Sequence, residues 1–148
     1  MKSLLEPVAR EGLLRRFRAL RPDSPRCWGR MTAPEMLAHL SDQMRHRLGD
    51  ATTSPRRGLL RWPPFKQLVM FWLPWPKGRV RGPAEAFVTR PGNWDEDFRS
   101  FETLVARFVE ATGRKDWPEH AFFGRMTRRS WGRFCHRHFD HHLRQFGV

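Results

Sequence analysis

The sequence predicts an all-α protein, a four-helix bundle with a long, proline- and aromatic-rich connection between the second and third helices. Two observations lead to this prediction. Four segments of the 148 residues carry apolar side chains at helical spacing, and seven prolines between residues 50 and 93 interrupt any long helix there. Strand patterns are weak, with residues 86–89 as the one short candidate. We expect a single domain over residues 1–148, because a chain of this length can bury one core.

The first helix is expected over residues 7–20, where apolar side chains recur every three or four positions with arginines between them. Residues 21–25 contain two prolines, which end this helix. The apolar positions are Val8, Leu13, Leu14, Phe17 and Leu20.

The second helix has clear signals at both ends. Thr32 and Glu35 have the spacing of a capping box, in which each side chain accepts a hydrogen bond from the other residue's backbone N–H, and Pro34 suits the first turn. Gly49 is expected to end the helix, because glycine readily adopts the left-handed conformation that follows a helix. The apolar stripe consists of Met36, Leu37, Leu40, Met44 and Leu48.

The connection over residues 50–93 is expected to hold a short helix around residues 65–73 and otherwise to be an ordered loop. Its aromatic side chains have two main interpretations: plain core packing, which is the simpler one, or an apolar lid over a pocket for a hydrophobic substrate. A membrane-surface patch is disfavoured, because the prolines prevent a long amphipathic helix. The aromatic residues are Trp62, Phe65, Phe71, Trp72 and Trp75.

The third helix is expected to begin near Asn93, with Glu96 at the capping-box position, and to end before Gly113. The fourth is expected to begin after Thr127 and to run through Phe146. The stripe of the third helix consists of Phe98, Phe101, Leu104, Val105, Phe108 and Val109.

The composition excludes several classes of protein. Hydrophobic residues make up 39% of the chain, too many for a disordered protein. Cys27 and Cys135 are too few for a disulfide-dense scaffold or a cysteine-only zinc finger, and we expect them to be free thiols. No apolar run approaches the roughly 20 residues of a membrane-spanning helix, and residues 1–17 make a poor signal peptide. We therefore expect a cytoplasmic protein.

The net charge of +13 permits binding to nucleic acid, anionic lipid or acidic substrates without requiring any of them. A basic nucleic-acid-binding module is therefore an alternative function, and it predicts phosphate contacts with steep salt dependence. No helix-turn-helix, zinc-finger or RNA-recognition motif supports it, and a solvated arginine-rich surface is the simpler interpretation. The phosphate contacts would come from Arg15, Arg16, Arg18, Arg128, Arg129 and Arg133.

Histidines suggest a different chemistry, because four of the seven fall between residues 136 and 142. His138 and His142 lie one helical turn apart, on a face shared with Trp131, Cys135 and Gln145. Two imidazoles at this spacing can hold one transition-metal ion. The alternative is a pair of partly buried, hydrogen-bonded histidines without a metal.

A catalytic metal site of this kind needs a third protein ligand from elsewhere in the chain. His39 lies beside Met36 and Gln43, at the flank of the apolar stripe of the second helix. His46 on the same helix and His120 in the loop before the fourth helix are the other candidates. Periodicity alone does not select among the three.

Two motifs resemble those of the DinB/YfiT-like superfamily of proposed metalloenzymes. Residues 36–43 (MLAHLSDQ) look like its second-helix motif, and residues 138–146 (HFDHHLRQF) look like its fourth-helix motif. Residues 120–124 also resemble the loop before that helix in one uncharacterised branch. The resemblance implies one divalent transition metal, Zn, Ni, Fe or Mn, and the implied ligands are His39, His138 and His142.

The resemblance further implies a metal-dependent enzyme, either a hydrolase or a thiol S-transferase, that acts on a small molecule. An S-transferase would also use a low-molecular-weight thiol. A non-catalytic bundle with a structural metal is the remaining alternative. A homodimer is compatible with the sequence, and nothing in it fixes an interface.

The residues around the expected ligands offer no clear general base, so no catalytic residue is assigned. Asp42, Gln43 and Gln145 are candidates to orient a ligand or a bound water, with solvent exposure as the alternative for Asp42. Cys135 is expected to be a buried small apolar residue rather than a ligand. The remaining histidines, expected at the surface, are His46, His136 and His141.

Overall fold

The regular secondary structure is helical in the described part of the chain, which in this computed structural model comprises residues 1–78 and 84–148. No β-strand forms within these residues, although His120 and Gly124 make one isolated bridge. The predicted all-helical class is therefore confirmed. The α-helices are α1 (Pro7–Arg18), α2 (Ala33–Leu48), α3 (Phe65–Gln67), α4 (Trp94–Glu110) and α5 (Arg128–Leu143).

The described residues contain five α-helices, one more than the four of the predicted bundle. The additional one, α3, is a three-residue helix in the connection, and it continues into a π-helical turn, η2 (Leu68–Trp72). It lies where the short helix around residues 65–73 was expected. The part of the expected connection at residues 79–83, with Pro83, lies outside the described residues.

The ends of the long helices follow from local hydrogen bonding. Thr32 and Glu35 form the predicted capping box at the start of α2, and Gly49 ends that helix with φ +82°. The Asn93 side chain accepts hydrogen bonds from the first turn of α4, and Thr127 does the same for α5. These caps satisfy backbone N–H groups that have no partner within the helix, so the predicted starts are confirmed.

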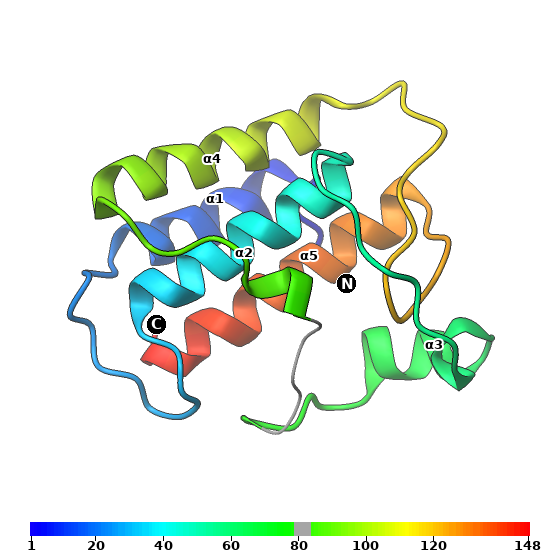
Figure 1. Cartoon of the computed structure of the whole chain (residues 1–148), viewed down its shortest axis with the longest axis horizontal. Helices are drawn as coiled ribbons and strands as arrows, with labels where there is room; N and C mark the ends of the chain where they lie inside the picture. The colour runs from blue at the N-terminus through cyan, green and yellow to red at the C-terminus, as the bar shows by residue number, and fades with distance from the viewer. Residues whose placement is uncertain (79–83) are drawn as a thin grey trace.

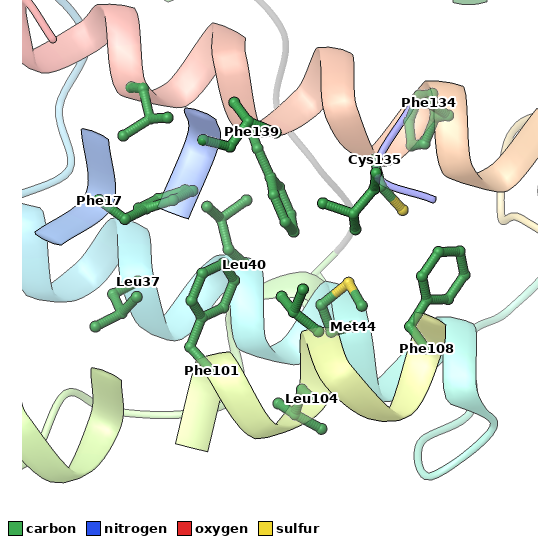
Figure 2. Close-up of a cluster of buried hydrophobic side chains, with 14 of the residues drawn as sticks. Phe17, Leu37, Leu40, Met44, Phe101, Leu104, Phe108, Phe134, Cys135 and Phe139 are labelled. Atoms are coloured by element: carbon green, nitrogen blue, oxygen red, sulfur yellow. The ribbon is translucent and has the colours of Figure 1, made fainter. Parts of the chain in front are cut away.

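The core lies between α1, α2, α4 and α5. Helix α2 packs against α4, and α1 packs against α5 (Figure 1). Phe17, Phe101 and Phe139 come from three of these helices and turn into the same interior space (Figure 2). Their ring centroids lie 5.0 to 5.7 Å apart in tilted or edge-on arrangements, which are favourable for aromatic rings.

Some side chains of the connection between α2 and α4 are buried against the core, and others are exposed to solvent. Met70 is fully buried and Trp75 is half-buried against Phe134, whereas Trp62 and Trp72 are 69% and 75% exposed. Core packing is therefore wrong for Trp62 and Trp72. For Trp72 the reason is helical geometry, because a turn that directs Met70 inward directs the residue two positions later toward solvent.

The strand expected at residues 86–89 is absent, and η3 (Ala84–Phe87), a 3₁₀-helix, covers its first half. The backbone here bonds to side chains of α2 instead of to another strand. Asp42 accepts hydrogen bonds from the N–H groups of Val88 and Thr89, and His46 contacts the carbonyl oxygen of Glu85. These bonds fasten the segment against α2.

Two further expectations concern thiols and membranes. Cys27 is exposed, Cys135 is buried, and both are free thiols, as predicted. Among residues 1–78 and 84–148, no helix has the length and apolar character needed to cross a membrane.

Candidate metal centre

Three histidines from two helices meet beside the core. Each of His39, His138 and His142 offers a ring nitrogen within 4.8 Å of those of the other two. His138 and His142 are one turn apart on α5, and His39 faces them from α2, with ring centroids 5.5 and 5.1 Å away. The structure thus brings together the three residues that the resemblance implied. His39 can face α5 because it lies at the flank of the apolar stripe that packs α2 into the core.

Hydrogen bonds to the outer nitrogens define the orientation of two of these rings. Nδ1 of His39 donates to the carbonyl oxygen of Ala86 at 2.8 Å, and Nδ1 of His142 donates to Oε1 of Gln145 at 2.6 Å. Both acceptors are oxygens without a proton, so Nδ1 carries the proton in each ring, and in the neutral form of these rings Nε2 carries none. An outer N–H held by an oxygen is typical of metal-binding histidines.

His138 completes a chain of hydrogen bonds across the cluster. Its Nε2 lies 3.0 Å from Nε2 of His142, and since the latter carries no proton, His138 is the donor. Nδ1 of His138 then accepts from Nη2 of Arg47 at 3.3 Å. Every imidazole in this arrangement is neutral.

Burial accounts for this neutrality. It lowers the pKa of His39 to about 4 and that of His142 to about 3, and it holds the pKa of His138 well below the usual range. The charge of Arg47 acts in the same direction on all three. The cluster therefore presents neutral imidazoles at pH 7, the form that binds metal ions.

The three other predicted site residues have different surroundings. Gln145 contacts His142 directly, as described above. Gln43 is half-buried and lines the pocket in front of the histidines. Asp42 is buried rather than exposed, and its carboxylate contacts the segment after η3 and Arg45 at 2.9 Å, not His39. Asp42 fastens the segment that carries the Ala86 carbonyl, and its negative charge also raises the pKa of His39, against the larger effect of burial.

The histidines open into a pocket of about 390 Å³. One wall is the face of α2 that carries His39, Gln43, His46 and Arg47, which recur at helical spacing. A second wall is the matching face of α5, and the connecting segments cover the remainder with apolar side chains. These covering residues include Trp28, Met31, Leu60, Val69, Trp75, Phe122 and Phe123.

The predicted aromatic lid is present only in part. Trp75 lines the pocket and packs edge-on against His138 and His141, with ring centroids 5.9 and 5.5 Å away. Trp62, Phe65 and Trp72 do not line the pocket and are exposed. The lid interpretation is therefore wrong for these three side chains.

Two histidines expected at the surface line the pocket instead. His46 is half-buried beneath the segment around η3, and His141 is half-buried between Trp28 and Trp75. The surface prediction is wrong for both, because loop segments distant in sequence fold over them. His136 is half-buried and is not among the residues that line the pocket.

His120, the alternative third ligand, has a structural role in its loop. Its Nδ1 accepts hydrogen bonds from the backbone N–H groups of Phe122 and Phe123 at 3.1 and 3.3 Å. Burial lowers its pKa to about 3, so the ring is neutral. His120 lines the pocket but does not belong to the three-histidine cluster.

Arg47 is a charged residue of the pocket that we did not predict. It is 1% exposed, and its guanidinium carbon lies 5.4 Å from the ring centroid of Trp131 and 5.5 Å from that of Phe134. The sequence carries a signal for it, since Arg47 follows Met44 by three positions and Leu40 by seven and so lies within the apolar stripe of α2.

Half of the six arginines of the nucleic-acid alternative already have partners within the chain. Arg16 pairs with Asp140 at 2.7 Å, Arg18 donates to Glu102 at 2.7 Å, and Arg128 donates to a backbone carbonyl. Phosphate would have to share or replace these partners.

Comparison with known proteins gave a single type of match. No curated protein and no solved structure matches the chain significantly. The model of a family described as "Protein of unknown function (DUF1569)" matches residues 35–147, a range that contains the three histidines, Arg47 and Gln145. The chain therefore belongs to the DUF1569 family, whose function is unknown.

Proposed function

We propose that His39, His138 and His142 bind one divalent transition metal, and that the protein is a metal-dependent enzyme of the DinB/YfiT-like type with a four-helix bundle formed by α1, α2, α4 and α5. The observation that supports this proposal most strongly is the convergence of three neutral imidazoles in a largely apolar pocket. The two sequence motifs that resemble the superfamily contribute these same side chains.

The donor set fits such a metal. Imidazole nitrogens bind Zn, Ni and Fe well, whereas Mg and Ca prefer oxygen ligands. Two nitrogens on one tetrahedral ion with bonds of 2.0–2.1 Å are about 3.3 Å apart, and the Nε2 atoms of His138 and His142 are 3.0 Å apart. His138 and His142 would hold the metal through these two Nε2 atoms, both of which must be unprotonated for this.

An open coordination position distinguishes catalytic from structural sites. Among residues 1–78 and 84–148, the potential ligand group contains three histidines and no fourth member, and the pocket adjoins them. When bound, the metal supplies a Lewis acid for water, a substrate oxygen or a thiolate. Ala86 and Gln145 orient the ligand rings, and the aromatic cover reduces access of bulk water.

Between the two reaction types, the surroundings favour thiol S-transfer. A hydrolase often uses a carboxylate as general base, but Glu119, the acidic residue that lines the pocket, pairs with Arg61 and Arg125. Asp42 is engaged with Arg45 and Thr89. A thiol loses its proton near neutral pH beside positive charge and needs no such base.

The first test is the metal content of the untagged protein, measured by mass spectrometry after reconstitution with Zn, Ni, Fe or Mn. We expect about one equivalent, and a loss of about tenfold or more in affinity when His39, His138 or His142 is replaced by alanine. His136→Ala is the matched control, because it removes a half-buried imidazole from the same helix outside the cluster.

The second test screens the loaded protein for transfer of low-molecular-weight thiols to electrophiles and for ester and amide hydrolysis. Metal-dependent turnover that His142→Ala abolishes would support the enzyme. A protein that binds no metal under any of these conditions would contradict the proposal. A metal whose removal lowers the melting temperature, without any turnover, would indicate a structural site.

A further inference from the structure

Arg47 is a buried cation without an acidic partner. Its side chain makes no ion pair among the residues that the structure describes, and residues 79–83 (RVRGP) contain no acidic side chain that could supply one. Cys135 lies near enough to interact with it, but burial raises the pKa of that thiol, which is therefore neutral. Arginine retains its proton in proteins, so the pocket wall carries a positive charge.

The hydrogen bonds of Arg47 leave most of its donors unused. Nη2 donates to His138 at 3.3 Å, Nη1 contacts the sulfur of Met44 at 3.8 Å, and Nε is buried with no partner. The aromatic faces of Trp131 and Phe134 offset part of the cost of burying the charge. The indole N–H of Trp131, which also lines the pocket, is a second buried donor with no partner.

Occupancy of the metal site would increase this imbalance. A neutral His138 that binds a metal through Nε2 must carry its proton on Nδ1, where it can no longer accept a hydrogen bond from Arg47. The cluster would then hold a divalent ion and a guanidinium with neutral imidazoles and no carboxylate between them. Buried charges are retained in proteins when an opposite charge accompanies them.

We propose that the missing negative charge belongs to the substrate, which is a small, largely apolar molecule bearing an oxyanion, a carboxylate or a phosphoryl group, that pairs with Arg47. Arginine suits this role because its planar donors match two oxygens of such a group. The apolar part of the substrate would pack against the aromatic cover, including Trp75 and Phe122. The claim that the anion is a substrate rests on the proposed enzymatic function. The claim that Arg47 binds an anion does not depend on that function.

The test measures binding of benzoate, phenylphosphonate and the neutral benzamide by calorimetry or ligand-observed NMR. We expect at least one of the two anions to bind about tenfold more tightly than benzamide, as a charge-assisted hydrogen bond in a buried site would provide. Benzoate and phenylphosphonate separate the two oxyanion classes. Equal affinity for all three probes, or no binding of either anion, would overturn the proposal without the use of any variant.

Variants then test whether the preference for anions over benzamide depends on Arg47. Arg47→Met should abolish it, and Arg47→Lys should retain part of it, because lysine keeps the charge but not the planar donors. Arg129→Met removes an equal charge from an exposed position on the same helix as His138 and should leave the preference unchanged. Thermal melts identify a variant that does not fold, and a preference that survives in folded Arg47→Met would overturn the assignment.

Parallel titrations of chelator-treated and metal-loaded protein separate this inference from the proposed function. A preference for anions in the metal-free protein that depends on Arg47 supports the anion site even where no metal binds. One equivalent of metal without an Arg47-dependent preference would support the metal centre and contradict the anion site.

Discussion

The two sides of the pocket are built differently. The helical side consists of α2 and α5, which supply the three histidines and Arg47. Other residues of these two helices face the core and are fully buried. The covering side consists of connecting segments, from which Trp75, Phe122 and a few other side chains reach the pocket while Trp62 and Trp72 remain exposed. The polar groups suited to bind a metal and an anion lie on the rigid side, and the apolar surface that would select a substrate lies on the other.

This division has a physical reason. A metal or an anion requires donors held to within a fraction of an ångström, and side chains on packed helices meet this requirement better than side chains on loops. An apolar cover needs only suitable shape, so its residues can come from segments with little buried surface of their own. Substitutions on each side of the pocket test this division of roles.

The first prediction contrasts the stability contributed by the two sides. Phe101→Ala should lower the free energy of unfolding by about 3–5 kcal/mol, because it leaves a cavity against Phe17 and Phe139. Trp72→Ala, at a residue that is 75% exposed, should change it by less than about 0.5 kcal/mol. Chemical denaturation measures both values, and similar losses in the two variants would show that the connection is part of the cooperative core.

The second prediction concerns the attachment of the two sides to each other. Asp42→Ala leaves the N–H groups of Val88 and Thr89 and the guanidinium of Arg45 without their carboxylate. We expect a loss of about 2–3 kcal/mol in stability and faster hydrogen exchange at the amides of Val88 and Thr89. Asp23→Ala, at an exposed acidic residue, serves as the control, and unchanged exchange in Asp42→Ala would show that other contacts fasten this segment.

The third prediction examines how the helical side orients its ligands. Gln145→Ala removes the oxygen that holds Nδ1 of His142, and it should weaken metal binding by about 10–100-fold. Gln145→Glu keeps an acceptor oxygen and should restore the affinity, whereas a merely structural residue would not be rescued in this way. Competition with a chromophoric chelator measures the affinities, and exposed Gln67→Ala is the control.

The fourth prediction uses the pH dependence of His120 on the covering side. Burial lowers its pKa to about 3, whereas an unperturbed histidine titrates near 6.5. Below about pH 6.5 the unfolded chain therefore gains a proton that the folded chain does not, so the stability is complete above this pH and falls as the pH decreases. At pH 5 the loss amounts to about 2 kcal/mol for this residue.

His120→Asn should remove this contribution, because the amide oxygen can replace Nδ1 as acceptor for the N–H groups of Phe122 and Phe123 without titrating. The difference in unfolding free energy between pH 7.5 and pH 5 should thus be about 2 kcal/mol smaller in the variant than in the wild type. The other histidines contribute equally to both proteins. Equal pH dependence would show that His120 is protonated in the folded protein.

Much of the fold could be predicted because its signals are local. The capping box of Thr32 and Glu35, the helix end at Gly49 and the caps at Asn93 and Thr127 depend on residues within a few positions of one another, and all are confirmed. The spacing of His138 and His142 is likewise local. Their association with His39 followed from the resemblance, and the binding of a metal there stays a prediction.

Other features depended on chain segments that are far apart in sequence. His46 and His141 were expected at the surface, but loops fold over them. Trp62 and Trp72 were expected inside or over the pocket, but both side chains are exposed. Asp42 has its role only because Val88 and Thr89 reach it from more than 40 positions away.

Near neighbours in the chain set the hydrogen bonding and periodicity of a helix. The helical class, the starts of the long helices and the pair of imidazoles on one face of α5 could therefore be predicted from the sequence alone. The enclosure of Arg47 beside three neutral histidines, with no counterion among the residues that the structure describes, could be found only from the folded chain. Burial depends on which distant segments cover a residue, and it is burial that turns an ordinary surface arginine into a charge in need of a partner.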